Sequence, residues 1–443
     1  MQIIRSLYIA ARFYLALFSI AVLFTIGFFV DVVIAIAEIA SIGVVVICLV
    51  DLLLLYSKRS GIEATRIAPN RLSNGDENTI KLLVKSNYGI STSVEIIDEI
   101  PIQFQIRNFS IHQKFTQFSE HQFSYKLTPV NRGDFDFGSI NIFVNTNLSL
   151  FKRRFTVAAH QTVPVYPSYI QMRKFEMYAI SNRLTDLGVK KVRRLGHTME
   201  FDQIREYVRG DDIRSINWKA TARSNHLMIN QYQDERSQQI INMVDLGRVM
   251  KMPFDGLQLL EYAINTSLVL SNIAVLKEDK AGLISFSNDK LTVVPPDKKR
   301  THVRKIQQAL YNIETNFMES DYDKLLVGLK SHIKQRSLVL LYTNFETLSS
   351  MERQLPYLRK IAKDHLLVTI FFENTELTSL TQQDSENVSD IYLKTIAEKF
   401  SFEKKQIIKS LNSYGIHSIY TPPKELSINA INKYLELKAR ALI

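Results

Sequence analysis

Two long apolar stretches at the beginning of the chain constrain its fold more than any other feature. Residues 7–30 and 32–56 are almost wholly apolar, and only a short segment around Asp31 separates them. At about 1.5 Å of rise per residue, each stretch is long enough to cross a hydrocarbon core about 30 Å thick. A cleaved signal peptide would have a shorter apolar core and a cleavage site of small residues. We therefore expect residues 1–60 to form a two-helix transmembrane hairpin.

Charged residues within and beside these stretches predict the orientation of the hairpin. Arg5 and Arg12 lie at its beginning, and Lys58 and Arg59 follow its end. Because cytoplasmic flanks carry the excess of basic residues, we expect both ends and all of the soluble mass in the cytoplasm. A carboxylate that faces lipid near the bilayer centre costs about 2.5–3.5 kcal/mol. We therefore expect Glu38 near the outer interface or at a helix–helix contact, and an anchor rather than an ion relay.

The next hundred residues have the sequence pattern of a β domain. Residues 61–167 contain short runs in which apolar and polar positions alternate, such as 78–87 and 121–130, with Asn, Gly and Pro between them. A period of two is typical of strands that bury one face. A series of such strands over this length predicts an immunoglobulin-like β-sandwich.

The last part of the chain, residues 238–443, alternates apolar strands with amphipathic helices. Expected strands are 240–245, 281–286, 291–294, 338–342, 366–372 and 417–420, and expected helices are 257–278, 301–315, 322–334, 351–364, 390–414 and 428–442. Continuous apolar strands that alternate with helices predict a mainly parallel sheet covered on both faces. The fold class is therefore multidomain, with a helical hairpin, a β-sandwich and a C-terminal α/β domain.

Residues 168–237 link the last two domains and carry a dense pattern of charges. The segment holds the only tryptophan, Trp218, and its basic and acidic residues alternate with apolar ones. A disordered linker would lack the apolar positions, and Gly210 followed by Asp211 and Asp212 is typical of a turn. We expect a folded ion-pair network whose apolar side packs on another surface, either that of a partner protein or that of a neighbouring domain. The network residues are Glu200, Arg205, Glu206, Tyr207, Gly210, Asp211, Asp212, Arg214, Trp218, Lys219, Arg223, Glu235 and Arg236.

Most of these residues, with Gly196, Phe201, Ala222 and Asp234, resemble the signature of the bacterial "domain of unknown function 58" family. Ile204 and Asn217 stand where that signature usually has Leu and Asp. The family's D-P-x-G-L-F motif is degraded here to residues 145–151, which lack the aspartate. The resemblance implies a von Willebrand factor A-like domain, a bacterial inner-membrane location and association with a MoxR-type AAA+ ATPase and other A-type membrane proteins.

An A-type domain often binds Mg²⁺ through a D-x-S-x-S motif after its first strand, and the resemblance directs attention to Asp245. Gly247 and Val249 stand in place of the two serines, and Asn344 stands where a second carboxylate is usual. Mg²⁺ prefers a full set of oxygen ligands. The sequence therefore favours a structural role for Asp245, capping its loop or pairing with Arg248, over a magnesium site.

Motifs of common catalytic sites are absent from the sequence. It contains no G-x-S-x-G elbow, no phosphate-binding P-loop, no H-E-x-x-H and no C-x-x-C, and it has one cysteine. Two histidine–acid pairs, His197 with Glu200 and His226 with Asp234, match no metal-ligand spacing. The chain is therefore not itself an ATPase, and no cofactor is expected.

These observations favour a membrane-anchored cytoplasmic adaptor or scaffold, not an enzyme, that works with the ATPase in complex assembly or stress tolerance. One alternative is a membrane-associated hydrolase or transferase that uses Asp211, Asp212 and His197. Another follows from the net charge of +11: residues 190–194 (KKVRR) would bind anionic lipid or nucleic acid, although no stacking motif supports nucleic acid.

Overall fold

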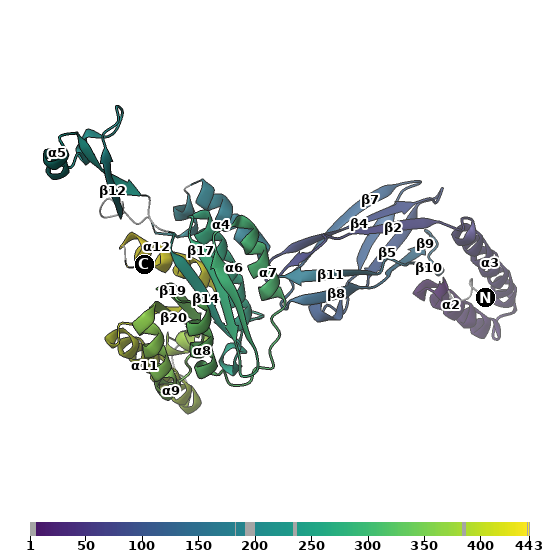
Figure 1. Cartoon of the computed structure of the whole chain (residues 1–443). Coiled ribbons are helices and arrows are strands. Elements are labelled where there is room, and N and C mark those ends of the chain that lie inside the picture. Colours follow the sequence, from purple (N-terminus) through teal and green to yellow (C-terminus); the bar gives the residue numbers. More distant parts are fainter. Residues whose placement is uncertain are drawn as a thin grey trace. The chain divides into compact units, whose positions relative to one another are not determined.

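The computed structural model describes residues 6–181, 183–190, 200–233, 237–382, 387–440 and 442. The chain divides into two compact units, Met1–Tyr166 and Pro167–Ile443. The first unit has an N-terminal helical region and a β-rich domain, and the second is mixed α/β (Figure 1). Each unit is described by itself.

The N-terminal helical region consists of α2 (Ala11–Gly27) and α3 (Asp31–Tyr56), joined by a tight turn. α3 is long and apolar enough to cross a membrane, whereas α2 is a shorter apolar helix of 17 residues. The expected first span is wrong at its beginning, because Leu7–Ile9 form strand β1, which pairs with β10 (Phe151–Val157). Glu38 is exposed on α3.

The β-rich domain is a sandwich of antiparallel sheets. One sheet has the order β1-β10-β9-β5-β6, a second has β2-β4-β7, and a third has β3-β11-β8, in which β3 pairs in parallel with β11. Leu82 and Val84 of β4 pack against Ile96 of β5 and Ile142 of β9, so the core lies between the first two sheets. The remaining bounds are β2 Ile62–Ile67, β3 Leu72–Ser73, β4 Asn78–Ser86, β5 Thr92–Asp98, β6 Ile111–Phe115, β7 Glu120–Leu127, β8 Gly133–Phe137, β9 Ile140–Asn145 and β11 Gln161–Tyr166.

The end of α3 is built into this sandwich through Asp51. Its carboxylate is fully buried and accepts hydrogen bonds from the backbone amides of Leu150 (3.1 Å) and Phe151 (3.0 Å) and from the Thr146 hydroxyl. These donors belong to the loop between β9 and β10, the site of the degraded family motif. Charge-assisted bonds from backbone amides to a buried carboxylate are stronger than bonds between neutral groups. The carboxylate therefore joins the helix to the sheet.

Arg153 of β10 satisfies the carbonyl groups that the last turn of α3 leaves open. Its guanidinium donates to the carbonyl oxygens of Leu55 (2.8 Å), Lys58 (2.7 Å) and Arg59 (3.0 Å). A cation at a helix C-terminus also interacts favourably with the helix dipole. The helical region and the sandwich are thus connected by a fixed junction rather than a loose tether.

The second unit is organised on a six-stranded sheet with the order β18-β17-β14-β19-β20-β21. All neighbouring strands are parallel except the edge strand β18, which is antiparallel to β17. The strand bounds are β14 Gln239–Asp245, β17 Lys280–Phe286, β18 Leu291–Asp297, β19 Leu338–Tyr342, β20 Leu366–Phe372 and β21 His417–Thr421. The order reverses direction between β14 and β19, where open α/β sheets commonly bind ligands.

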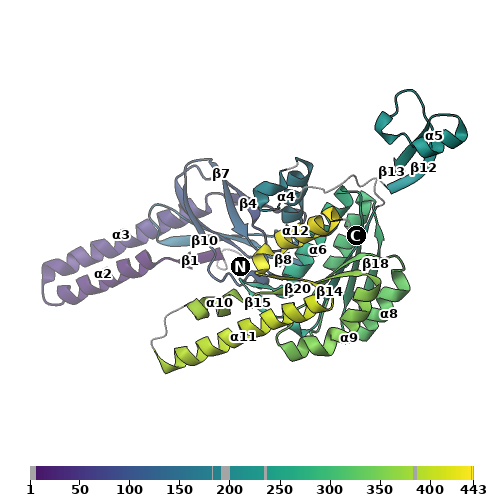
Figure 2. The ribbon, with the colours of Figure 1, turned by 90° about the vertical axis from the view of Figure 1, so that its left-hand side faces the viewer.

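Helices cover both faces of this sheet (Figures 1 and 2). On one face lie α4 (Tyr169–Ile180), α6 (Leu259–Leu276), α7 (Arg300–Tyr311) and α12 (Leu426–Ala439). On the other lie α8 (Tyr322–His332), α9 (Leu348–Asp364) and α11 (Val388–Ser413). α6 is apolar and long enough to span a membrane but is mostly buried in the protein, so it is a core helix. The unit also contains α10 (Thr375–Gln382) and a short hairpin, β15 (Pro253–Phe254) and β16 (Leu257–Gln258).

Candidate functional site

The segment with the family signature folds as a small module of residues 200–233, here called the hairpin module. Strands β12 (Glu200–Glu206) and β13 (Met228–Gln233) pair antiparallel. The chain between them forms a 3₁₀ turn, Ile213–Ser215, and helix α5 (Trp218–Ser224). Hydrogen bonds between its own residues, among them those of Asp211 and Asn217, hold the module together.

An ion pair between Arg205 and Asp211 joins the end of β12 to the turn that follows it. The two guanidinium nitrogens Nη1 and Nη2 donate to the two carboxylate oxygens at 2.9 and 2.7 Å, and the Val208 amide donates to the same carboxylate at 2.8 Å. The hydrogen bond from Arg205, with that from the backbone, holds the pKa of Asp211 below its ordinary value. A bidentate pair fixes geometry even where solvent screening makes its net energy small.

Asp212 makes a different structural contact from Asp211. Its side chain accepts from the Arg214 amide at 2.9 Å and caps the 3₁₀ turn. Asn217, which stands where the family signature has Asp, caps α5 by accepting from the Ala220 amide at 3.0 Å, and its own amide group donates to Asn230 at 2.8 Å. An amide can donate and accept at once, whereas a carboxylate can only accept. Asp211 and Asp212 therefore serve two separate structural contacts.

Large apolar side chains of the module are exposed. Val208 is 61% exposed, Ile213 70%, Trp218 68% and Leu227 46%. The residues of the module itself leave these side chains uncovered. Several exposed large apolar side chains on a small folded module are typical of an interaction site.

Several predicted site residues fall outside the described residues or are only partly described. Lys191, Arg193, Arg194, His197, Asp234, Glu235 and Arg236 lie outside them, and of Glu200 only the backbone, in β12, is described. Arg214, Lys219 and Arg223 are exposed on the module, as are Glu206 and His226. Gly210 has a φ of +116°, which favours glycine at the turn.

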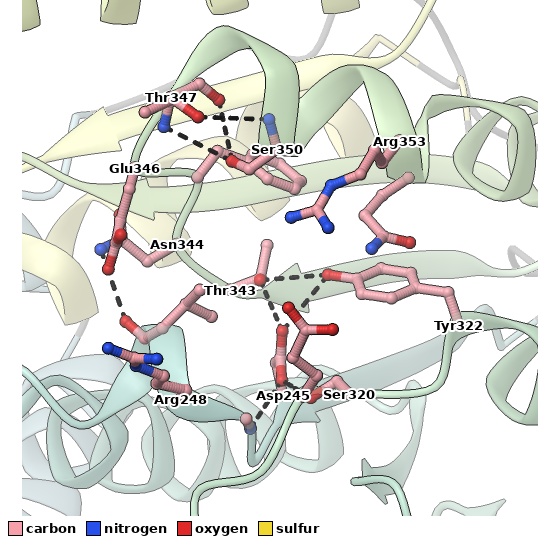
Figure 3. A pocket seen from close by; sticks show the side chains of 15 residues that line it. Asp245, Arg248, Ser320, Tyr322, Thr343, Asn344, Glu346, Thr347, Ser350 and Arg353 are labelled. Carbon is pink, nitrogen blue, oxygen red and sulfur yellow. Dashed lines mark hydrogen bonds between the residues drawn. The ribbon is translucent and has the colours of Figure 1, made fainter.

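The second candidate site is a pocket of about 340 Å³ where the sheet order reverses (Figure 3). Asp245 at the end of β14 and Thr343 just after β19 form its floor, and Arg248 and Arg353 lie on its sides. Thr347 at the N-terminus of α9 also lines it. The position agrees with the usual place of ligand sites in open α/β sheets.

The carboxylate of Asp245 is saturated with neutral donors. It is 1% exposed and accepts from the Gly247 amide (2.8 Å), the Thr343 hydroxyl (2.7 Å), the Tyr322 hydroxyl (3.2 Å) and the Ser320 hydroxyl. Burial raises its pKa, and these hydrogen bonds oppose the rise. A carboxylate has about four acceptor positions, so none remains for a cation. The expected pairing with Arg248 is absent from the described contacts, because these donors already surround the group.

Gly247 explains why a serine cannot occupy this position of the motif. A Cβ atom there would lie 2.9 Å from Oδ1 of Asp245 and against the hydroxyl of Ser320. Ser320 comes from a loop that is distant in sequence, and its hydroxyl thus occupies the space of the motif's first serine side chain. Sequence reasoning missed Ser320 and Tyr322, because no local pattern connects them with Asp245.

Asn344 and Val249 also lack the features of a metal site. The Asn344 amide is within 3.5 Å of the Val249 carbonyl oxygen and of the Lys404 ammonium. Lys404 donates to the Phe345 carbonyl as well, and burial lowers its pKa to about 8. In the part of the chain that the structure describes, no three His, Cys, Asp or Glu side chains converge on a possible metal position. The residues present do not fit a magnesium ion.

Comparison with known proteins gives one family match and distant structural likenesses. A family described as "Protein of unknown function DUF58" matches residues 203–397. The uncharacterized protein YeaD of Bacillus subtilis (strain 168) is 27% identical over 124 residues, which is 28% of this chain and 30% of that protein. The chain thus matches less than a third of that relative's length. The match to the family includes most of the hairpin module and most of the α/β sheet.

Among solved structures, the CARDB domain of a Pyrococcus furiosus protein is 16% identical and covers 24% of this chain and 94% of its own, with a TM-score of 0.17. Proximal thread matrix protein 1 from the mussel byssus is 13% identical and covers 37% of this chain and 46% of its own, with a TM-score of 0.22.

Proposed function

We propose that this chain is a membrane-anchored adaptor that presents the hairpin module to a partner protein at the cytoplasmic face of the bacterial inner membrane. The observation that carries the proposal is the exposure of Val208, Ile213 and Trp218 on a module whose fold is fixed by internal bonds. A surface that is rigid before binding loses less conformational entropy on docking. Exposed tryptophan is also enriched among the residues that dominate binding energy.

The helices α2 and α3 support the anchoring part of the proposal. Most of their large apolar side chains are exposed in the described structure, as expected for surfaces that face lipid. Lys58 and Arg59 follow α3, and Arg12 near the start of α2 lies beside the same end of the sandwich, where it donates to carbonyl oxygens of the β9–β10 loop. This placement of basic residues favours a cytoplasmic location for the sandwich and all that follows.

The α/β unit is interpreted as a von Willebrand factor A-like domain, and the sandwich as immunoglobulin-like. The strand order, the antiparallel edge strand and the helices on both faces support the first interpretation. The partner we propose is a MoxR-type AAA+ ATPase, which follows from the resemblance of the hairpin module to the family signature. In this proposal the chain contributes contacts, and the ATPase supplies the chemistry.

The alternative of a hydrolase or transferase has less support. It requires Asp211 and Asp212 to converge with His197 on one pocket, whereas Asp211 binds Arg205 and Asp212 caps a turn. His197 lies outside the described residues, as does most of the basic run 190–194. No described geometry favours either alternative over the adaptor.

A pulldown from detergent-solubilised membranes, with and without ATP, tests the adaptor proposal. The wild-type chain and a control variant, Met177→Ala, are compared with Trp218→Ala. Met177 is also largely exposed (62%) but lies on α4. We expect an AAA+ ATPase with the first two proteins and about tenfold less with Trp218→Ala, as is usual for loss of a dominant interface tryptophan. Recovery of no AAA+ protein in either nucleotide condition would contradict the proposal.

A further inference from the structure

Helix α11 exposes large apolar side chains over most of its first half. Ala397, Ile407 and Leu411 are buried against the unit, whereas six large apolar side chains nearer the N-terminus of the helix are exposed. These are Val388 (83% exposed), Ile391 (56%), Tyr392 (68%), Leu393 (50%), Phe400 (36%) and Phe402 (60%). In Figure 2 the first half of α11 has the short helix α10 beside it.

Four of the exposed side chains share one side of the helix. At about 100° of rotation per residue, Val388, Ile391, Tyr392 and Phe402 fall within a sector of about 100°, and Ala397 lies opposite. From Val388 to Phe402 this apolar stripe is about 21 Å long at 1.5 Å per residue. Lys399 and Lys409 lie on the same side and are exposed. The helix therefore has two apolar sides, one that packs on the core and one that is exposed.

We propose that this stripe lies on the surface of an anionic membrane, an inference that rests on the anchoring part of the proposed function. Aliphatic and aromatic side chains beside lysines are the composition of helices that lie in the lipid interface. Tyrosine suits the boundary between acyl chains and head groups, and lysine ammonium groups bind acidic head groups while their stems cover apolar surface.

Because the anchor already holds the chain at the bilayer, even a weak contact between α11 and lipid would be populated. One short amphipathic helix binds a bilayer only weakly and reversibly. The helices α2 and α3 hold the chain at the same bilayer, which converts this contact into an intramolecular event with a high effective concentration. α11 would then act as a second point of attachment that orients the α/β unit on the membrane.

The test uses the full chain in nanodiscs, with one label per protein. The single cysteine, Cys48, is replaced by alanine, and Tyr392→Cys or Ser401→Cys carries an environment-sensitive fluorophore. Ser401 is an exposed residue of α11 outside the stripe, so it serves as the matched control. Discs contain phosphatidylcholine alone or with phosphatidylglycerol, each with and without a nitroxide quencher on the acyl chains.

We expect quenching at position 392 in the anionic discs that is at least about twofold stronger than at position 401 and than in neutral discs. Addition of Lys399→Glu and Lys409→Glu should remove the difference. Equal quenching at both positions, or protection of position 392 only when a partner protein is added, would overturn the lipid contact while leaving the anchor intact. Failure of the chain to co-purify with discs would overturn the anchor itself, and with it this inference.

Discussion

At the scale of single residues, the pocket of the α/β unit is characterised by the hydroxyl and amide groups that surround Asp245. Four neutral donors surround Asp245, and Gly247 makes room for one of them, the Ser320 hydroxyl. These donors come from three separate segments of the chain. The carboxylate therefore connects these segments at the edge of the sheet where the strand order reverses.

Gly247→Ala should therefore destabilise the α/β unit. The added methyl group would lie against Asp245 and Ser320, and overpacking of this kind costs about 1–3 kcal/mol. Gly89→Ala is the control, because a Cβ there meets only ordinary contacts at 3.5 Å or more. Thermal unfolding of the detergent-solubilised protein measures both variants. Unchanged unfolding of Gly247→Ala would show that the arrangement around Asp245 is not tight.

The lowered pKa of Lys404 predicts that the stability of the folded protein depends on pH in the alkaline range. Its pKa is lowered from 10.5 to about 8, so between these values the unfolded chain binds more protons than the folded one. Stability contributed by this group therefore rises as pH increases from about 8 to about 10.5 and is lost as pH falls through 8. In Lys404→Met we expect this part of the pH dependence to disappear, measured by chemical unfolding at a series of pH values. An unchanged slope would contradict the assignment to Lys404.

At the scale of elements, regular periodicity made most of the α/β unit predictable from sequence. The apolar strand 338–342 agrees with β19, and the strands on either side of it were also found within a few residues. Short or irregular elements were missed. β1 is a three-residue strand inside an apolar stretch, and α10 has a polar sequence with weak helix preference.

The candidate sites were less predictable, for a different reason. The resemblance to the family directed attention to Asp245, whereas no role was expected for Asp51. The partners of both carboxylates are distant in sequence: Ser320 and Tyr322 for Asp245, and Leu150 and Phe151 for Asp51. A backbone amide that binds a carboxylate cannot be recognised from residue types, because almost every residue has one. The exposure of Trp218 could not be predicted either, because an apolar residue between charges fits a buried side and a docking surface equally well.

The junction between α3 and the sandwich gives a prediction at this scale. Asp51→Ala would leave the buried amides of Leu150 and Phe151 without an acceptor, at a cost of about 1–3 kcal/mol for each unsatisfied group. We expect faster proteolysis after α3, near residues 57–61, and a lower unfolding temperature of the sandwich. Glu38→Gln, an exposed acid of the same helix, is the control. Equal protease resistance of both variants would mean that other contacts, such as those of Arg153, suffice.

At the scale of the whole molecule, the proposed function gives each part a role in presenting a surface. Asp51 and Arg153 fix α3 to the sandwich, and the α/β unit carries the hairpin module with its exposed tryptophan. The account therefore depends on whether the module contacts a partner.

Site-specific photo-crosslinking in intact cells measures that contact most directly. A photoreactive amino acid at position 218 or 213 is compared with one at position 177, and adducts are identified by mass spectrometry. The account predicts adducts with an AAA+ ATPase from positions 218 and 213 and none from position 177. Adducts that are absent from position 218, or that form equally from all three positions, would contradict it.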